Sequence, residues 1–186
     1  MTQTRTLQEA VREILQSVGE DPQRQGLRGT PERVARLYLE LFSGVGRDPL
    51  EEFTAESAEG QHGAVALRGI PFSSMCEHHL LPFFGSASIG YLPEGRVAGL
   101  SKIVRVLEVL ARRPQLQERL TNQVADALYQ ALAPAVVAVV LNAEHLCLSI
   151  RGVQKPGTRV VTYATRGGAA VSSPGREELL ALLRGT

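Results

Sequence analysis

The spacing of apolar residues changes along the chain and separates a helical beginning from a mixed remainder. Near the N-terminus apolar residues recur every three or four positions, which predicts two amphipathic helices. The first extends from Leu7 to a stop at Gly19, and the second begins at Thr30-Pro31 and ends at Gly44. Thr30 is expected to cap the second helix, with Pro31 as its first helical residue.

Farther along, apolar residues alternate with polar or small ones, which predicts an antiparallel sheet. Its strands are expected from Ala64 to a turn at Cys76, and in the ranges 84–91, 135–142, 145–151 and 158–165. The range 135–142 is continuously apolar and is expected to be buried on both faces. In the range 145–151, alternation would place four polar residues on one face, namely His145, Cys147, Ser149 and Arg151.

Three more helices are expected among these strands. They begin at an N-cap at Ser101, at Pro114, and at Ser173-Pro174. The chain is therefore expected to be an α+β protein that forms one folding unit. Residues 1–63 would be its N-terminal helical segment, and residues 64–186 its main domain.

Length and composition restrict the class of protein. The chain has 186 residues, 44% apolar and 21% charged, which suits one globular domain with a small helical appendage. No apolar run approaches the roughly 20 residues of a membrane span, and the N-terminus does not resemble a secretory signal, so we expect a cytoplasmic protein. A net charge of +1 and the absence of tryptophan argue against a nucleic-acid partner.

The sequence Cys76-Glu77-His78-His79 holds one of the two cysteines and two of the four histidines. Cys76 and His79, three positions apart, can reach one ion from a tight turn, and Cys147 supplies a second sulfur. Two thiolates and one imidazole form a zinc site with a fourth position open, and His78 and His145 beside it could move protons. Other interpretations remain: the cysteines could be buried apolar residues or a disulfide, and His78 or His145 could be a fourth ligand.

Two helix starts carry polar groups that suit a ligand. Ser101, Lys102 and Arg105 lie at the start of a helix, where free N–H groups and the helix dipole favour an anion. Considered alone, a capped helix with solvated charges is the favoured interpretation. Gln117 and Glu118 lie in the first turn of the next helix, where Glu118 either stabilises the dipole or accepts hydrogen bonds from a guanidine-like ligand edge.

Five sequence blocks occur in a recognisable order. They are Thr30-Pro31-Glu32-Arg33-Val34-Ala35, Cys76-Glu77-His78-His79, Gly99-Leu100-Ser101-Lys102-Ile103, residues 113–121, and Glu144-His145-Leu146-Cys147 with Arg151-Gly152-Val153. Together they resemble the zinc-dependent GTP cyclohydrolase I family, over most of the chain from Glu20 to Thr165.

The resemblance implies an enzyme that converts GTP and water to formate and 7,8-dihydroneopterin triphosphate, at the entry to folate or tetrahydropterin (tetrahydrobiopterin) biosynthesis. It implies the tunnelling fold, an antiparallel sheet with helices packed on one face, assembled into a toroidal homodecamer with sites between subunits. The implied zinc ligands are Cys76, His79 and Cys147.

The resemblance also assigns roles to the remaining site residues. The proton-transfer residues would be His78 and His145, with His145 favoured for guanine N7, and Ser101 would assist near the ribose. The guanine edge would be read by Gln117 and Glu118. The triphosphate would be bound by Lys102, Arg105 and Arg151, with Arg33 reaching in from an adjacent subunit.

Two other functions remain under consideration. A nitrile reductase of the same tunnelling fold uses a cysteine nucleophile and NADPH, but that chemistry needs no set of zinc ligands. A structural zinc or nucleotide-binding module would bind without turnover, and it would normally close the metal site with four protein ligands.

Overall fold

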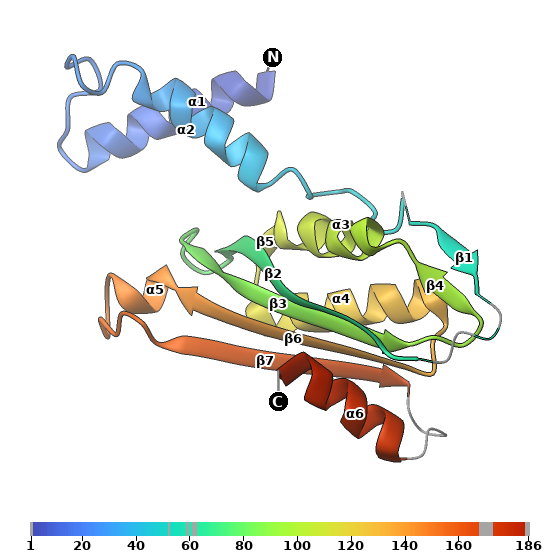
Figure 1. Ribbon diagram of the computed structural model, residues 1–186. Helices are drawn as coiled ribbons and strands as arrows, with labels where there is room; N and C mark the ends of the chain where they lie inside the picture. Colours follow the sequence, from blue (N-terminus) through green and yellow to red (C-terminus); the bar gives the residue numbers. More distant parts are fainter. Residues whose placement is uncertain (1, 52, 59, 61–62, 168–172, 185–186) are drawn as a thin grey trace. The chain divides into compact units, whose positions relative to one another are not determined.

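The structure is a computed structural model that describes residues 2–51, 53–58, 60, 63–167 and 173–184. The chain forms two compact units, Met1–Ser43 and Gly44–Thr186. The first unit is helical, and the second contains the sheet (Figure 1). Within the described ranges, none of the helices combines the length and the apolar character needed to cross a membrane.

The first unit is a pair of packed helices, α1 (Thr2–Ser17) and α2 (Thr30–Leu41), as the apolar spacing predicted. α2 begins one residue earlier than expected, because Thr30 is already helical and Gly29 takes the cap position. The Thr30 hydroxyl is therefore not a cap, and it accepts a hydrogen bond from the exposed Arg33 side chain (3.0 Å).

The second unit is built on a five-stranded sheet in the order β5-β2-β3-β6-β7. Its strands are β2 (Val65–Cys76), β3 (Pro82–Leu92), β5 (Pro114–Gln115), β6 (Val136–His145) and β7 (Arg159–Gly167). All neighbours pair antiparallel except β5, which pairs parallel to the end of β2. A separate two-stranded sheet pairs β1 (Ala55–Ser57) with β4 (Arg96–Ala98). The predicted antiparallel sheet is confirmed.

Helices cover this sheet on both faces (Figure 1). They are α3 (Leu100–Ala111) and α4 (Gln117–Leu132) on one face and α6 (Ser173–Arg184) on the other. The short α5 (Leu146–Ser149) follows the end of β6. Val137, Val139 and Leu141 of β6 pack in one core with α3 and α4, whereas Val136 and Ala138 pack with α6. Because strand side chains alternate between faces, β6 is buried on both sides, as its apolar run predicted. The α+β class is confirmed, and α6 adds a helix on the second face.

The start of α3 differs slightly from the expectation. Gly99 occupies the cap position, so Leu100 is the first helical residue and Ser101 lies inside the first turn. The expectation that Ser101 is the N-cap is therefore wrong. Gly99 has an extended backbone (φ −58°, ψ 132°), which is the usual conformation of an N-cap residue.

Pro114 does not start a helix. Pro114 and Gln115 form β5, which pairs with Met75 and Cys76 at the end of β2, and α4 begins at Gln117. This pairing partner is distant in sequence, so helical periodicity downstream of Pro114 could not reveal it. Gln117 is thereby placed at the first position of α4, next to the end of β2.

The strand expected at 145–151 is also wrong beyond His145. β6 ends at His145, which pairs with Phe83, and the next residue of β3 is Pro82, which has no N–H to offer. The chain must then satisfy its backbone groups locally, and it forms the single turn α5. His145, Cys147, Ser149 and Arg151 consequently do not share one strand face.

A substitution at Gly85 of β3 tests how closely the backbones of β3 and β6 must approach. A Cβ at Gly85 would lie 2.0 Å from the Asn142 carbonyl oxygen and 2.7 Å from Ala143 Cα, both backbone atoms of β6. We expect Gly85→Ala to lower the free energy of unfolding by about 1–3 kcal/mol, measured by chemical denaturation. The matched control is Gly63→Ala, whose Cβ meets nothing within 4 Å. Equal unfolding midpoints for the two variants would contradict this account.

Candidate metal centre and surrounding polar site

The turn after β2 is closed by backbone hydrogen bonds that bring Cys76 and His79 together. Leu80 N donates to the Cys76 carbonyl oxygen, and Cys76 N donates to the Leu81 carbonyl oxygen, each at 2.9 Å. Leu80 adopts a left-handed conformation (φ 51°), which reverses the chain. Cys76 Sγ and His79 Nδ1 then lie 3.7 Å apart. The local sequence thus supplies two metal-ligand atoms from one turn.

Cys147 reaches the same place from α5. The two sulfurs of Cys76 and Cys147 and a ring nitrogen of His79 all lie within 4.8 Å of one another. Both cysteines are free thiols rather than a disulfide. Among the residues that the structure describes, these three form the one cluster of cysteine, histidine or carboxylate groups close enough to share an ion.

The chemistry of these donors fits zinc. Burial and the neighbouring Cys76 raise the pKa of the Cys147 thiol, while the charge of Arg151 acts in the opposite direction. Two thiolates side by side repel each other, and a divalent cation between them removes this penalty because a coordinating thiol is deprotonated. Two sulfurs and one imidazole suit Zn²⁺, and three protein ligands are the number found in catalytic zinc sites.

His145 is fixed at the end of β6 by a ring stack and a hydrogen bond. Its ring lies parallel to that of the buried Phe83, with centroids 4.6 Å apart and planes inclined by 2°. Its Nε2 lies 2.7 Å from Oε1 of Gln117. Burial lowers the pKa of His145, and the charge of Glu118 partly opposes that shift. The imidazole is therefore held in one orientation, two residues before Cys147.

Gln117 and Glu118 are neighbours in the first turn of α4 but have different surroundings. Gln117 is 1% exposed, and its amide is hydrogen-bonded to His145 and to backbone oxygens of two strands. Glu118 is exposed, and its charge reaches His145. The Glu118 carboxylate is thus available to a ligand, whereas the Gln117 amide nitrogen would first have to release an internal partner.

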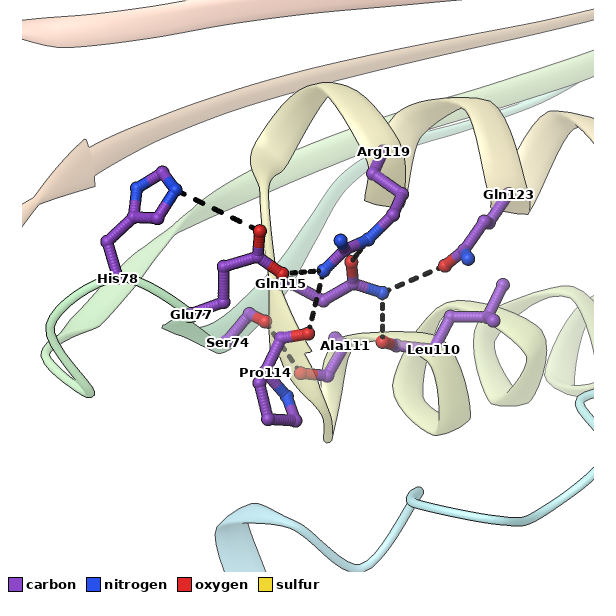
Figure 2. A network of polar contacts seen from close by, with 9 residues as sticks. All are labelled: Ser74, Glu77, His78, Leu110, Ala111, Pro114, Gln115, Arg119 and Gln123. Atoms are coloured by element: carbon purple, nitrogen blue, oxygen red, sulfur yellow. Dashed lines mark hydrogen bonds and ion pairs between the residues drawn. The ribbon is translucent and has the colours of Figure 1, made fainter.

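The turn after β2 that carries Cys76 and His79, here called the metal turn, also contains Glu77. Glu77 is tied by hydrogen bonds to the start of α4 (Figure 2). Arg119 donates one hydrogen bond to Glu77 Oε2 and others to Gln115 Oε1 and the Pro114 carbonyl oxygen, both at 2.9 Å. The exposed His78 has its Nε2 3.9 Å from Glu77 Oε1. This network joins the turn that carries Cys76, His78 and His79 to the helix that carries Gln117 and Glu118.

Glu144 holds the loop that carries Arg151. Its Oε1 accepts hydrogen bonds from Ser149 Oγ (2.7 Å) and from Gly157 N (3.0 Å). The bond from Gly157, and then that from Ser149, lowers the pKa of the Glu144 carboxyl. Arg151 is exposed in this loop, and its charge reaches Cys147. The loop therefore presents one arginine close to the metal cluster.

The start of α3 is not brought to the metal cluster within one chain. The carbonyl oxygen of Ala111, at the end of α3, accepts a hydrogen bond from Ser74, two residues before Cys76. Ser101 lies ten residues before Ala111, so at a rise of 1.5 Å per residue the two are about 15 Å apart along the helix. Lys102 follows Ser101, and Arg105 lies one turn nearer to Ala111.

Three side chains that shape the site were not among the predicted site residues. The sequence around Phe83 indicates only a buried aromatic residue, and its place beside His145 follows from the strand register. Arg119 and Glu144 lie within the recognised sequence blocks, but their sequence neighbours give no sign of their partners. Arg33 belongs to the first compact unit, so its expected role at a neighbouring subunit's site stays a prediction.

The sequence profile of the family described as GTP cyclohydrolase I matches residues 7–184. The chain belongs to the GTP cyclohydrolase I family. It is 52% identical over 180 residues to GTP cyclohydrolase 1 of Halalkalibacterium halodurans, with 96% of each chain covered. It is 50% identical over 184 residues to GTP cyclohydrolase 1 of Streptococcus gordonii, with 98% of each chain covered.

Among solved structures, the apo form of the archaeosine synthase QueF-Like aligns with a TM-score of 0.45 at 19% identity. The alignment covers 61% of this chain and 99% of that one. The assignment to the GTP cyclohydrolase I family rests on the family profile and on the relatives at about half identity.

Replacing Glu144 by glutamine tests whether its charge anchors the Arg151 loop. Because folding lowers the Glu144 pKa, its stabilising effect is present above the ordinary glutamate pKa of about 4.3. The effect is lost as the pH falls through the lower folded-state pKa. We expect Glu144→Gln to melt below the wild type at pH 7, and the difference to shrink below about pH 4.3. Calorimetry at several pH values measures it, with Glu94→Gln in an exposed turn as the control; a pH-independent difference would argue against a charge effect.

Proposed function

We propose that the chain catalyses the GTP cyclohydrolase I reaction, in which GTP and water give formate and 7,8-dihydroneopterin triphosphate. The observation that carries the proposal is the meeting of Cys76, His79 and Cys147 from distant parts of a chain of this family, with His145 two residues from Cys147. Loss of the guanine C8 atom as formate requires a strong nucleophile and a proton donor at one place. The cluster and the fixed imidazole supply groups of both kinds.

Zinc is the metal that we propose for this cluster, held by Cys76, His79 and Cys147. When bound, zinc supplies hydroxide near neutral pH by lowering the pKa of water to about 7. Arg151, whose charge reaches Cys147, adds a positive charge beside the two sulfurs. Arg119 holds the turn through Glu77, so the positions of Cys76 and His79 do not depend on the ion alone.

Proton transfer is assigned to His78 and His145, the two histidines that lie close to the proposed ligand residues in the sequence. Guanine C8 is a poor electrophile, and a proton placed on the adjacent N7 makes attack at C8 easier. His145 is the candidate for N7 because Phe83 and Gln117 fix its ring. His78 is exposed on the metal turn beside Glu77, and it is the candidate for proton transfers during ring opening and formate release.

Substrate recognition is assigned to charged groups that a ligand can reach. Glu118 is exposed at the start of α4, and its carboxylate can accept hydrogen bonds from the N–H edge of guanine. Lys102, Arg105 and Arg151 would bind the triphosphate, which the overall charge of +1 could not attract by itself. Binding energy from the triphosphate, far from C8, orients the purine. Ser101 would lie near the ribose.

The distance along α3 supports a site that two subunits complete. Within one chain, Ser101 and Lys102 lie at the far end of α3 from the metal turn, about 15 Å along the helix. A second copy of the chain can present its own α3 start to the cluster. We therefore propose a homo-oligomer, and a homodecamer as in the family resemblance, with Arg33 as a further residue from an adjacent subunit.

The proposed enzyme carries out the first step of folate or tetrahydrobiopterin biosynthesis in the cytoplasm. Its proposed small-molecule partner is GTP, and neither a nucleic acid nor a membrane is proposed as a partner. The net charge of +1 favours a small-molecule partner over a nucleic acid.

Zinc content and formate production, measured on the same sample, test the proposed activity. We expect about one zinc ion per chain, GTP-dependent formate release, and a product that becomes a fluorescent pterin after oxidation. Chelation should abolish the release, and added zinc should restore it. A zinc-loaded sample that leaves GTP unchanged would refute the proposal, and zinc-independent oxidation of NADPH with a nitrile would favour the reductase.

The variants His145→Ala and Cys147→Ala separate proton transfer from metal binding. We expect His145→Ala to retain zinc while formate release falls by roughly 100-fold or more, because one proton-transfer group is lost. Cys147→Ala should lose both zinc and activity, because one of three ligands is gone. Zinc analysis by mass spectrometry and a formate assay measure these effects. Loss of zinc from His145→Ala would instead make His145 a fourth ligand, as in a structural site.

A further inference from the structure

The amide of Gln117 lies at the junction of α4, β6 and β7. Its Nε2 is within hydrogen-bonding distance of the Leu141 carbonyl oxygen (3.2 Å), the Val160 carbonyl oxygen (2.9 Å) and Thr162 Oγ1 (3.1 Å). Its Oε1 is 2.7 Å from His145 Nε2. The side chain is 1% exposed, so these internal partners account for its amide nitrogen.

The partners determine which way the amide faces. Carbonyl oxygens only accept hydrogen bonds, so the amide nitrogen of Gln117 must face Leu141 and Val160. The amide oxygen must then face His145. An amide oxygen also only accepts, so the hydrogen between Gln117 Oε1 and His145 Nε2 belongs to the histidine.

The two threonines beside Gln117 support the same direction. Thr121 Oγ1 donates to the Gln117 carbonyl oxygen (2.7 Å), which uses its one hydrogen. In the 2.6 Å contact between the two hydroxyls, Thr162 must therefore donate to Thr121. The Thr162 oxygen is then left to accept from Gln117 Nε2. The directions of donation are therefore mutually consistent: His145 donates to the Gln117 amide oxygen, the Gln117 amide nitrogen donates to Thr162, Thr162 donates to Thr121, and Thr121 donates to the Gln117 backbone oxygen.

We propose that Gln117 is a positioning residue that holds His145 by its Nε2–H, so that Nδ1 is the ring nitrogen left for the substrate, and Nδ1 gives a proton to N7 from the imidazolium form of the ring. The proposal rests on the proposed function, because the substrate of His145 is taken to be the purine. Phe83 fixes the plane of the ring, and Gln117 fixes which nitrogen carries the hydrogen. In this arrangement Gln117 acts through His145, and guanine recognition falls to the exposed Glu118.

The first experiment identifies the hydrogen-bearing nitrogen directly. Wild-type protein with ¹⁵N-labelled histidine is studied by solid-state NMR at about pH 8.5, above the ordinary imidazole pKa of about 6.5. The His145 signal is assigned by its absence from His145→Ala. We expect a hydrogen on Nε2, and a hydrogen on Nδ1 instead would overturn the proposal. The NMR result does not depend on turnover. A failure of the proposed function would show itself separately, as a wild-type protein that releases no formate from GTP.

The second experiment separates positioning from guanine recognition. Gln117→Met has a similar length and no hydrogen-bonding group, and Gln130→Met on the exposed side of α4 is the matched control. We expect Gln117→Met to retain zinc and to lower single-turnover formate release roughly 10- to 100-fold, the range measured when partners that orient metal-binding histidines are lost. The KM for GTP should change by less than about threefold, because in this proposal Gln117 does not itself bind GTP.

Two results would overturn the positioning role. One is a KM raised tenfold or more with an unchanged single-turnover rate, which marks a residue that reads the purine. The other is wild-type behaviour of Gln117→Met in both constants. If Gln117→Met fails to fold, Thr162→Val removes one partner of the amide nitrogen and leaves Oε1 in place. That variant should keep the His145 Nε2–H signal, and a shift of the hydrogen to Nδ1 there would contradict the proposed orientation by the carbonyl oxygens.

Discussion

The backbone pairing of β3 with β6 is the constraint on which the site depends. It places Phe83 opposite His145 and stacks the two rings, and it ends where β3 begins with Pro82. Proline has no N–H to donate to the ladder at this point, and after His145 the chain turns into α5. That turn brings Cys147 to Cys76 and His79. The metal cluster is thus a consequence of where one strand loses its partner.

The start of α4 provides the second constraint. Gln117 is buried against β6 and β7 and bonds His145, while Arg119 holds the metal turn through Glu77. Within the described part of the chain, no buried side-chain nitrogen or oxygen lacks a hydrogen-bond partner. A polar site is stable inside a protein only when its groups are paired in this way. The histidine and the metal turn are therefore held by the same helix.

The basic residues at the start of α3 do not lie beside the metal-binding groups of the same chain. The cysteines, His145 and Arg151 meet at one end of the sheet. Lys102 lies in the first turn of α3, and the last residue of that helix, Ala111, is the one near this end. Within one chain the fold therefore keeps the start of α3 apart from the cluster of Cys76, His79 and Cys147. The proposed homo-oligomer would bring the α3 start of one chain to this cluster in another, because each interface of a symmetric assembly repeats the same contact.

The sequence by itself determined the helices, the sheet and the identity of the groups that can bind a metal. An apolar period of about 3.6 identifies α1 and α2, and a continuous apolar run identifies the doubly buried β6. The rarity of cysteine and histidine marks Cys76, His79 and Cys147. Only the tertiary structure decided that Pro114 joins a strand, that α5 replaces the end of a strand, and that Gln117 faces inward to His145. The physical reason is that periodicity records which face of a segment is buried, whereas these features depend on hydrogen-bond partners that are distant in the chain.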